Sequence, residues 1–527
     1  MNIKIISNIL LVCLILISLI VPSKHVLHIF QQNRYDYKRY FDWIINYFKN
    51  NLIIVFVYLV LISISFFLKS INSVIIYVSI IYGIIAFIFF YKESKKEYIK
   101  PLVYTSRVKR QIFVLLLLDL IVIVLFLHYF DELYLLLFLF ISLIMNWILI
   151  LLANFLLMPI EKLVQNYYLN DAKKKLRSHL SLINIGITGS FGKTSSKNII
   201  QSIISEEYRS LMTPASFNTP MGITRTIREQ LKPSHQVFVC EMGADHVGDI
   251  KYLSDFVNPK IGIVTSIGIQ HLSTFKSLEN IIKEKMILIE KLPSDGIGII
   301  NYDNEYIREY NIKNSCKIIK YGIDNSDVDY QAVNIKYSPK GSKFKVKTKE
   351  KTYSFETKLL GKHNISNILA GIALARELNV EWKDIIKAVK YIPYIEHRLE
   401  VKTINGLKFI DNAFNSNPVG AKMSLEVMKM MPKKRIIVTP GMIDLGSKQK
   451  EVNYDFGYSM KDNIDIAILV GETQTLPIKQ GLDDSGFKSD NIYVVKTVKE
   501  AFALVYSIAT NKDTILLEND LPDAFNV

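Results

Sequence analysis

Gly186-Ile-Thr-Gly-Ser-Phe-Gly-Lys-Thr194 is the stretch that decides the fold of this chain. A β-branched run, Leu182–Ile187, leads into it, and Ser195–Ile204 reads as the helix that follows. A strand, a glycine-rich turn and a helix in this order form a phosphate-binding loop, because glycines let backbone N–H groups approach an anion that the helix N-terminus attracts. The spacing differs from the common P-loop, so the working glycines are predicted to be Gly189 and Gly192. A glycine-rich turn without a nucleotide is the alternative.

The same loop offers side chains suited to Mg-ATP. Lys193 can reach the β- and γ-phosphates, and the hydroxyl of Thr194 can ligate Mg²⁺. Ser190 and Ser195 flank these two residues and are expected to bind the phosphates with them. The loop therefore predicts an ATP site.

Short β-branched runs alternate with helical stretches from residue 182 onward, which predicts parallel sheets covered by helices. The first set of runs is Leu182–Ile187, Val237–Cys240, Ile261–Ser266 and Gly296–Ile300. The second set is Phe409–Ile410, Arg435–Thr439, Ile466–Val470, Ile492–Val495 and Thr514–Leu517. We expect a P-loop ATPase-like parallel-sheet domain at residues 182–395 and a smaller Rossmann-like domain at 396–527. Tyr391–His397 is the predicted hinge.

Two of these runs end in polar residues that suit a metal. Glu241 ends the run Val237–Cys240, and His271 follows Ile261–Ser266. Ligands of an open parallel sheet gather at the carboxyl ends of its strands, and a carboxylate there can hold Mg²⁺. A helix cap or salt bridge for Glu241 and a structural role for His271 are the alternatives.

The composition of the chain indicates that part of it spans a membrane. Half of the 527 residues are apolar, 21% are charged and the mean hydropathy is +0.21. These values exclude a disordered chain and argue against a purely soluble enzyme. Three cysteines support neither a disulfide framework nor a zinc site. Apolar stretches close to the ~20 residues that span a bilayer lie at Ile3–Val21, Leu52–Leu68, Val74–Phe90, Ile112–Leu127 and Leu133–Leu157.

Charge gives these spans an orientation. The formal charge of +15 is concentrated in the first 180 residues, where basic residues flank the apolar runs, so a membrane lipid rather than a nucleic acid is the expected partner. Strongly basic loops alternate with weakly charged ones, which places everything after about Pro159 in the cytoplasm. We therefore expect a membrane domain at residues 1–160 and a basic linker at 161–181. Asp119 lies within a span, and the run Phe30–Tyr40 could form an interfacial helix.

The order of the motifs resembles the Mur ligase family. The matching stretches are Thr188–Ser195, Asn218–Gly222, Glu241–Ala244, Gln270–His271, Phe275–Glu279, Gly361–Ala370, His397–Glu400, Asp411–Pro418 and Pro440–Gly446. They span about residues 182–480 of the chain. The soluble members carry a UDP-sugar-binding domain before the P-loop, whereas membrane spans and a short linker stand there in this sequence.

The resemblance assigns roles to individual residues. It implies that Lys193 and Thr194 bind the ATP phosphates and Mg²⁺, that Glu241 and His271 ligate Mg²⁺, and that Lys285 becomes an N-carboxylated metal ligand. By itself, Lys285 among charged neighbours indicates a solvated helix face. The resemblance further places four residues at the nucleotide: Asn364 and Asn367 near the adenine, Arg398 at the phosphates, and Asp411 or Asn412 at the ribose.

The activity that the resemblance implies is an ATP-dependent ligation of a carboxylate acceptor and an amine donor through an acyl phosphate. The expected setting is peptidoglycan precursor synthesis, with addition of D-alanyl-D-alanine or an amino acid. Polyglutamate synthases of the same superfamily also pair membrane segments with this core, so a lipid-linked or polymeric acceptor is the alternative. A nucleotide-gated membrane protein without ligase activity is a third interpretation, which the combination of Arg398 with Glu241 and His271 argues against.

Overall fold

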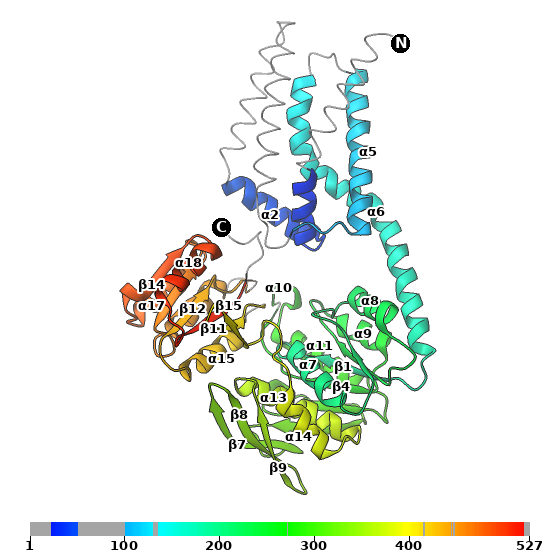
Figure 1. The fold of residues 1–527 in the computed structure, drawn as a ribbon. Helices are drawn as coiled ribbons and strands as arrows, with labels where there is room; N and C mark the ends of the chain where they lie inside the picture. The colour runs from blue at the N-terminus through cyan, green and yellow to red at the C-terminus, as the bar shows by residue number, and fades with distance from the viewer. Residues whose placement is uncertain are drawn as a thin grey trace. The chain divides into compact units, whose positions relative to one another are not determined.

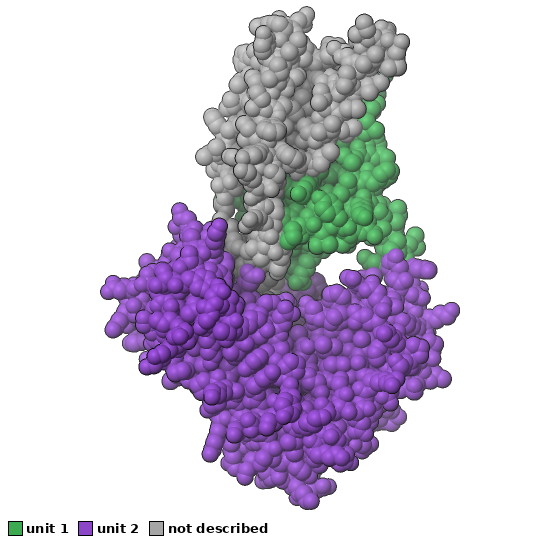
Figure 2. Space-filling view, viewed as in Figure 1, with its two compact units in different colours: residues 1–166, 521–526 green, residues 167–520, 527 purple. Residues whose placement is uncertain are grey.

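The computed structural model describes residues 23–50, 101–129, 135–270, 272–414, 417–443, 445 and 448–520. The chain divides into two compact units, which Figure 2 draws in different colours. The helical unit comprises residues 1–166 and 521–526, and the α/β unit comprises residues 167–520 and 527.

The described elements of the helical unit are all helices (Figure 1). They are a helix over residues 23–32, α2 (Tyr37–Asn50), α5 (Ser106–Tyr129) and α6 (Leu135–Arg177). Apolar side chains from three of these helices, including Phe30, Tyr40 and Ile150, are buried together. The ring of Trp43 stacks on that of Trp147 with 5.8 Å between the centroids, so aromatic side chains hold α2 against α6.

The five predicted spans are tested only in part. The first three, Ile3–Val21, Leu52–Leu68 and Val74–Phe90, lie outside the described residues. Ile112–Leu127 lies within α5, and Leu133–Leu157 overlaps α6. Within the described part of the chain, one helix, over Met145–Arg177, is long and apolar enough to cross a membrane. The region of several spans therefore stays a prediction.

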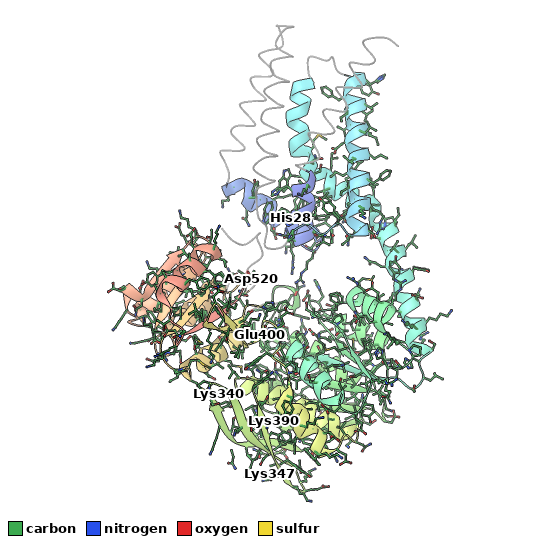
Figure 3. All side chains as sticks on the ribbon, in the orientation of Figure 1. His28, Lys340, Lys347, Lys390, Glu400 and Asp520 are labelled. Atoms are coloured by element: carbon green, nitrogen blue, oxygen red, sulfur yellow. The ribbon has the colours of Figure 1, made fainter. Side chains whose placement is uncertain are left out.

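The larger sheet of the α/β unit contains nine strands among the described residues, in the order β2-β3-β1-β4-β5-β6-β7-β8-β9. Their bounds are β1 Ile183–Thr188, β2 Ser210–Met212, β3 Val237–Glu241, β4 Ile261–Val264, β5 Ile297–Asn301, β6 Lys317–Gly322, β7 Tyr330–Ser338, β8 Gly341–Lys347 and β9 Thr352–Thr357. The strands from β2 through β7 pair in parallel, while β8 is antiparallel to both β7 and β9. Lys340 and Lys347, labelled in Figure 3, lie in this antiparallel extension.

Helices bury both faces of this sheet, which is why its central strands are continuously apolar. The helices of this part are α7 Lys193–Ile204, α8 Pro220–Gln230, α9 Asp249–Val257, α10 Leu272–Phe275, α11 Leu278–Glu290, α12 Glu305–Arg308, α13 Lys362–Glu377 and α14 Trp382–Tyr391. One buried cluster joins α7, α13 and α14 to the sheet, and a second joins α8, α9 and α11. Leu169, Ala172 and Leu176 from the last turns of α6 are buried in the second cluster.

The smaller sheet contains six strands among the described residues, in the order β10-β11-β15-β12-β13-β14. Its elements are β10 Glu400–Ile404, β11 Leu407–Asn412, α15 Pro418–Lys429, β12 Arg435–Thr439, α16 Gln449–Tyr458, β13 Ile466–Val470, α17 Leu476–Asp484, the short 3₁₀ helix η4 Ser489–Asn491, β14 Ile492–Val495, α18 Val498–Ile508 and β15 Thr514–Glu518. All neighbours pair in parallel except β10 and β11. Buried clusters on its two faces contain α15, α16 and α17 on one side and α18 on the other.

The two parallel-sheet regions confirm the α/β part of the predicted fold class, with one correction. The sheet after the P-loop is not purely parallel, because β7, β8 and β9 add two antiparallel hairpins that the sequence analysis did not anticipate. These strands alternate exposed and buried residues, as half-solvated antiparallel strands do, whereas the prediction relied on runs that are apolar throughout.

Candidate active site

The loop Gly189–Gly192 joins β1 to α7 at the carboxyl end of the sheet, between the ends of β3 and β4. Gly189 and Gly192 have φ angles of 153° and 80°. A Cβ at Gly189 would lie 2.2 Å from the hydroxyl oxygen of Thr265, and a Cβ at Gly192 would lie 2.9 Å from the amide oxygen of Asn367. Only glycine fits both positions, so the two predicted glycines shape the loop.

Bonds to the end of β4 hold the loop in this form. The backbone N–H of Ser190 donates to the carbonyl of Ser266 at 2.6 Å, and the Ser190 hydroxyl donates to the carbonyl of Gly268 at 2.9 Å. Thr265 and Ser266 donate their hydroxyls to the carbonyl of Phe191, at 2.5 and 3.1 Å. The hydroxyl and the backbone N–H of Ser190 therefore hold the loop in one conformation. A loop with a fixed backbone is suited to binding an anion.

Lys193 is the first residue of α7 and lies at the N-terminal end of the helix, where the backbone favours negative charge. Its ammonium group donates to the carbonyls of Gly189 at 2.7 Å and Ser190 at 3.2 Å, so it stays above the loop. Burial lowers the pKa of Lys193, and the positive charge of Arg398 lowers it further, while Glu241 opposes both effects. A half-buried cation near a second cation is well placed to receive a polyphosphate.

Glu241 ends β3 and is the most strongly held carboxylate of the site. Its Oε1 accepts from the hydroxyl of Thr194 at 3.2 Å and from the side-chain amide of Asn218 at 3.0 Å. Its Oε2 accepts from the ammonium of Lys197 at 3.0 Å, and both side chains of this ion pair are almost fully buried. Burial opposes ionisation of Glu241, but Lys197, Lys193 and the bonded amide outweigh it and lower its pKa.

Lys285 lies on α11, buried to 2% exposure, with no carboxylate in contact among the described residues. Its ammonium lies 5.8 Å from the centre of the Phe275 ring and 3.4 Å from the carbonyl of Ala244. Burial lowers its pKa to about 7, and Lys193 contributes in the same direction. The predicted solvated face is therefore wrong for Lys285, because its side chain points into the protein.

The neighbour of Lys285 anchors the same helix. Glu284 accepts the backbone N–H of Gly248 at 2.8 Å and that of Ile250 at 2.6 Å with its two carboxylate oxygens. These N–H groups belong to the start of α9, which has no side-chain cap of its own. Glu284 thus supplies the cap for α9 from another helix.

Arg398 precedes β10 and enters this site as a second free cation. Burial lowers its pKa, and the nearby carboxylates of Glu241 and Glu518 oppose that effect. Its guanidinium lies 4.8 Å from the centre of the Phe414 ring and forms no ion pair in the part of the chain that the structure describes. Burial, together with the positive charge of Arg398, lowers the pKa of His363 to about 4.

The start of α13 contributes amides with free hydrogen-bonding atoms. Asn367 accepts from the buried hydroxyl of Ser196 at 3.0 Å, and its own amide nitrogen has no partner among the described residues. Asn364 donates to the carbonyl of Leu360 at 2.8 Å and leaves its oxygen unbonded. His363 Nδ1 lacks a partner as well. Unpaired buried polar atoms are costly, so these residues fit a polar ligand such as a nucleotide.

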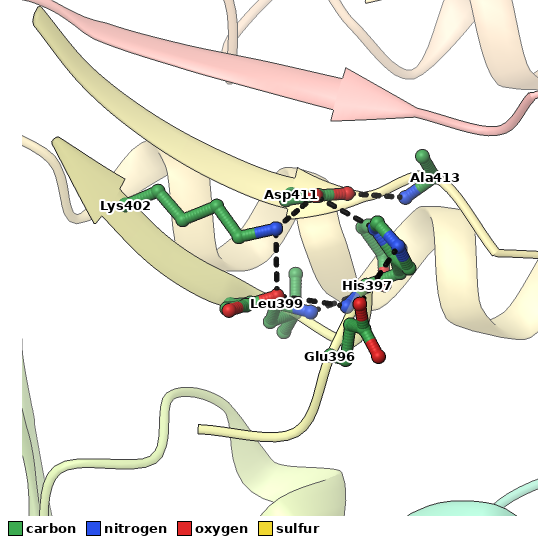
Figure 4. Close-up of polar contacts among 8 residues, drawn as sticks. Glu396, His397, Leu399, Lys402, Asp411 and Ala413 are labelled. Atoms are coloured by element: carbon green, nitrogen blue, oxygen red, sulfur yellow. Dashed lines mark hydrogen bonds and ion pairs between the residues drawn. The ribbon is translucent and has the colours of Figure 1, made fainter. Parts of the chain in front are cut away.

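Asp411 occupies a different network, which Figure 4 shows in close-up. Its carboxylate accepts from Lys402 at 2.8 Å and contacts His397 Nδ1 at 2.8 Å, and its other oxygen accepts the backbone N–H of Ala413 at 3.1 Å. Burial opposes ionisation, but these donors lower the pKa of Asp411. His397, Glu400 and Asp411 lie close enough to suggest a metal, yet the ammonium of Lys402 bonds to both carboxylates and already neutralises them.

The structure groups most of the predicted residues around the end of β1. Hydrogen bonds connect Thr194 to Glu241, and electrostatic effects connect Lys193 to Glu241, Lys285 and Arg398. Ser195 is buried in the first turn of α7. Asp411 is bonded within its own network rather than to the loop. His271 lies outside the described residues.

Three residues of the site were not among the predictions. Lys197 and Asn218 hold Glu241, and His363 lies within the electrostatic influence of Arg398. Lys197 stands four residues after Lys193 on the same helix, and this i, i+4 spacing is the signal that could have revealed it. Asn218 begins one of the stretches that resemble the family, Asn218–Gly222, but the sequence assigned it no role, because the fold brings its loop to the end of β3.

Comparison with known proteins identifies the family of the chain. The family model described as Mur ligase middle domain matches residues 187–375, and the model described as Mur ligase, glutamate ligase domain, matches residues 397–518. The chain belongs to the Mur ligase family. This confirms the family predicted from the sequence and, with it, the ligase class of enzyme.

Similar proteins give the same family. A UDP-N-acetylmuramoyl-tripeptide–D-alanyl-D-alanine ligase of Bacillus subtilis (strain 168) is 29% identical over 338 residues, 63% of this chain and 72% of the relative. The ligase of the same name from Escherichia coli (strain K12) is 28% identical over 55% of this chain and 64% of its own length. A crystal structure of MurF ligase from Thermotoga maritima in complex with ADP shares the fold, with a TM-score of 0.61 and 21% identity over 68% of this chain and 80% of that one.

Proposed function

We propose that this Mur ligase family member joins a carboxylate to an amine at the expense of ATP, through an acyl phosphate. The acceptor carboxylate attacks the γ-phosphorus and ADP leaves; the amine then attacks the acyl carbon, phosphate leaves, and an amide bond remains. The observation that carries the proposal is the grouping of Glu241 and Thr194 with three cations, the buried Lys285 and the half-buried Lys193 and Arg398, at one end of the sheet. Such a grouping suits a reaction that develops negative charge on transferred phosphate.

Each residue has a role in this reaction. The loop at Gly189 and Gly192 cradles the phosphates with backbone N–H groups, and Lys193 and Arg398 neutralise their charge. The amides of Asn364 and Asn367 offer unbonded atoms to the nucleotide, and Ser195 lies in the first helical turn behind the phosphates. Asp411, which lies beside His397 and Lys402, is proposed for the ribose.

Mg²⁺ fits the same residues. The carboxylate of Glu241 and the hydroxyl of Thr194 lie 3.2 Å apart and offer the hard oxygen ligands that Mg²⁺ prefers. When bound, Mg²⁺ would withdraw charge from the phosphate oxygens. His271 remains a proposed ligand from the resemblance alone. The pKa of about 7 for Lys285 leaves part of its amine neutral at pH 7, and a neutral amine is the form that reacts with carbon dioxide to give the proposed carbamate.

We infer the substrates of this chain from the names of its relatives. The two relatives described above are, by name, ligases of a UDP-N-acetylmuramoyl-tripeptide and D-alanyl-D-alanine. We assign this chain a peptidoglycan-precursor peptide as acceptor and D-alanyl-D-alanine as amine. Closure of the residues after the 391–397 segment over the loop would exclude water from the acyl phosphate.

The chain is further proposed to be a membrane protein with its α/β unit in the cytoplasm. The support is the apolar helix over Met145–Arg177 and the large apolar side chains exposed on α5, such as Phe113 and Val124. The described residues that precede β1 form helices rather than a sheet. This observation favours, as a second candidate, a ligase of the polyglutamate-synthase kind with a lipid-linked or polymeric acceptor.

Phosphate release by the purified full-length chain in detergent tests the proposal. Release should require ATP, a carboxylate acceptor and an amine together, and mass spectrometry should find an amide product. A UDP-linked and a lipid-linked muramyl tripeptide, offered in parallel with D-alanyl-D-alanine, separate the two candidates. ATP hydrolysis that responds to lipid alone, without any amide product, would instead support a nucleotide-gated protein.

A further inference from the structure

Arg107 lies in the first turn of α5, in the helical unit, and has no counter-ion among the described residues. Its guanidinium donates to the side-chain oxygen of Asn154 at 3.1 Å and lies 3.8 Å from the centre of the Tyr35 ring. Both partners are neutral, and no carboxylate pairs with Arg107 in the described part of the chain. Arg110, one turn further, differs because Glu161 binds it through two hydrogen bonds of 2.6 and 2.9 Å.

Gln111 shares a hydrogen-bond partner with Arg107. It lies four residues after Arg107 on one helix and donates to the same oxygen of Asn154, at 3.1 Å. Its side chain is fully buried, yet within the described part of the chain neither its amide oxygen nor Nε of Arg107 has a hydrogen-bond partner. Asn154 is itself fixed, because its amide donates to the hydroxyl of Tyr37 at 2.8 Å. The guanidinium of Arg107 thus retains an unused donor, and the buried amide oxygen of Gln111 is an unused acceptor.

The position along the helix indicates the kind of ligand. The first turn of α5 contains basic residues and no acidic one, although the N-terminus of a helix favours negative charge. From Phe113 onward the helix exposes large apolar side chains, including Leu117 and Val124. A polar, cationic end followed by an exposed apolar face matches a lipid whose charged headgroup lies at Arg107 and whose chains follow α5.

We propose that Arg107 and Gln111 bind the headgroup of a lipid phosphate that also carries a hydroxyl group. The phosphate accepts from the guanidinium, and the hydroxyl donates to the free oxygen of Gln111. Phosphatidylglycerol and a polyprenyl-phosphate-linked sugar share this chemistry. The inference rests on the membrane placement proposed above, and it accounts for the aromatic run 30–40, whose Tyr35 and Tyr37 build one wall of the site.

Lipid retention by the full-length chain, followed by native mass spectrometry without ATP, tests this site independently of ligase activity. The probes are phosphatidylglycerol, phosphatidylcholine, which has neither net charge nor hydroxyl, and a polyprenyl-phosphate-linked sugar. Arg107→Gln should weaken retention of the first or third probe about tenfold or more, because a hydrogen bond to a charged group is lost. Lys109→Gln is the matched control, since Lys109 is exposed in the same turn and should change retention less than about twofold.

The arms of the test identify the occupant. Arg107-dependent retention of phosphatidylglycerol alone assigns the site to bulk membrane lipid, and preference for the polyprenyl probe assigns it to a substrate lipid. Arg107→Lys, which keeps the charge but loses the planar donors, should give an intermediate affinity and guards against a variant that fails to fold. Equal losses in Arg107→Gln and Lys109→Gln, or no loss in Arg107→Gln, would overturn the proposal.

Discussion

Replacing Lys285 with methionine should make the α/β unit more stable while abolishing ligation. Lys285 is 2% exposed, its ammonium bonds only weakly to one carbonyl at 3.4 Å, and Lys193 repels it. The native fold therefore keeps this amine at a cost, which is expected of a group retained for chemistry rather than for packing. Methionine has a similar length and no charge, so it removes the cost without leaving a cavity.

The size of the gain follows from the pKa, which falls from 10.5 to about 7 on folding. The unfolded chain holds this proton up to pH 10.5 and the folded chain only up to about pH 7, so wild-type stability rises with pH across that interval. At 1.36 kcal/mol for each pKa unit, the lysine costs about 4–5 kcal/mol at pH 6.5 and about 1.5 kcal/mol at pH 9.5. The advantage of Lys285→Met should shrink by that difference as the pH rises.

Thermal unfolding of the full-length chain in carbon-dioxide-free buffer measures this effect. The transition of the α/β unit should rise by about 5–10 °C at pH 6.5 and by much less at pH 9.5. Lys283→Met is the control, because Lys283 lies two residues away on α11, is well exposed and forms its ion pair with Glu279. It should change the free energy of unfolding by less than about 0.5 kcal/mol. A Lys285→Met variant that is less stable than the wild type at pH 6.5, or whose advantage is independent of pH, would refute this account of Lys285.

Three further outcomes are expected from the α/β unit. Lys193→Ala should lower ATP-dependent phosphate release by at least about 10²-fold, and unchanged turnover in the presence of acceptor and amine would remove Lys193 from the catalytic group. Lys197→Met should destabilise the fold by about 3–5 kcal/mol in urea titrations, because it leaves Glu241 buried without its ion-pair partner; adding Glu241→Gln should recover part of the loss, and simple additivity would contradict the coupling. Arg398→Gln should reduce phosphate release about 10²-fold with little change in the unfolding midpoint, since Arg398 has no ion-pair partner among the described residues; a large drop in the midpoint would indicate a structural role instead.

The sequence predicts the parallel part of the fold closely, because buried parallel strands are short apolar runs. The strands β12, β13 and β14 have the predicted bounds, β3 ends one residue later than predicted, and β1 begins and ends one residue later. The hairpins β7–β9, the parallel strand β6 and the edge strands β2 and β10 escaped prediction. Their alternating or short patterns, such as Lys343 to Lys347, also fit exposed loops.

The site residues that belong to a recognisable sequence motif could be predicted. Those that only the tertiary structure brings to the site could not. The glycines and Lys193 follow from the loop sequence alone. The burial of Lys285 could not be foreseen from its charged neighbours Lys283 and Glu284, since helix position rather than local composition decides which side chain faces inward. Asn218 is brought to Glu241 from 23 residues away along the chain, and no local pattern announces that contact.

The two hydrogen bonds from α9 to Glu284 have a consequence for the residue that follows it. Adjacent residues on an α-helix differ by about 100° around its axis. The hydrogen bonds between Glu284 and α9 therefore fix the rotation of α11 about its own axis. This rotation directs the side chain of Lys285 into the protein, toward Lys193, rather than toward the solvent. Glu284 therefore has a positioning role: its hydrogen bonds to α9 determine the direction in which the side chain of Lys285 points.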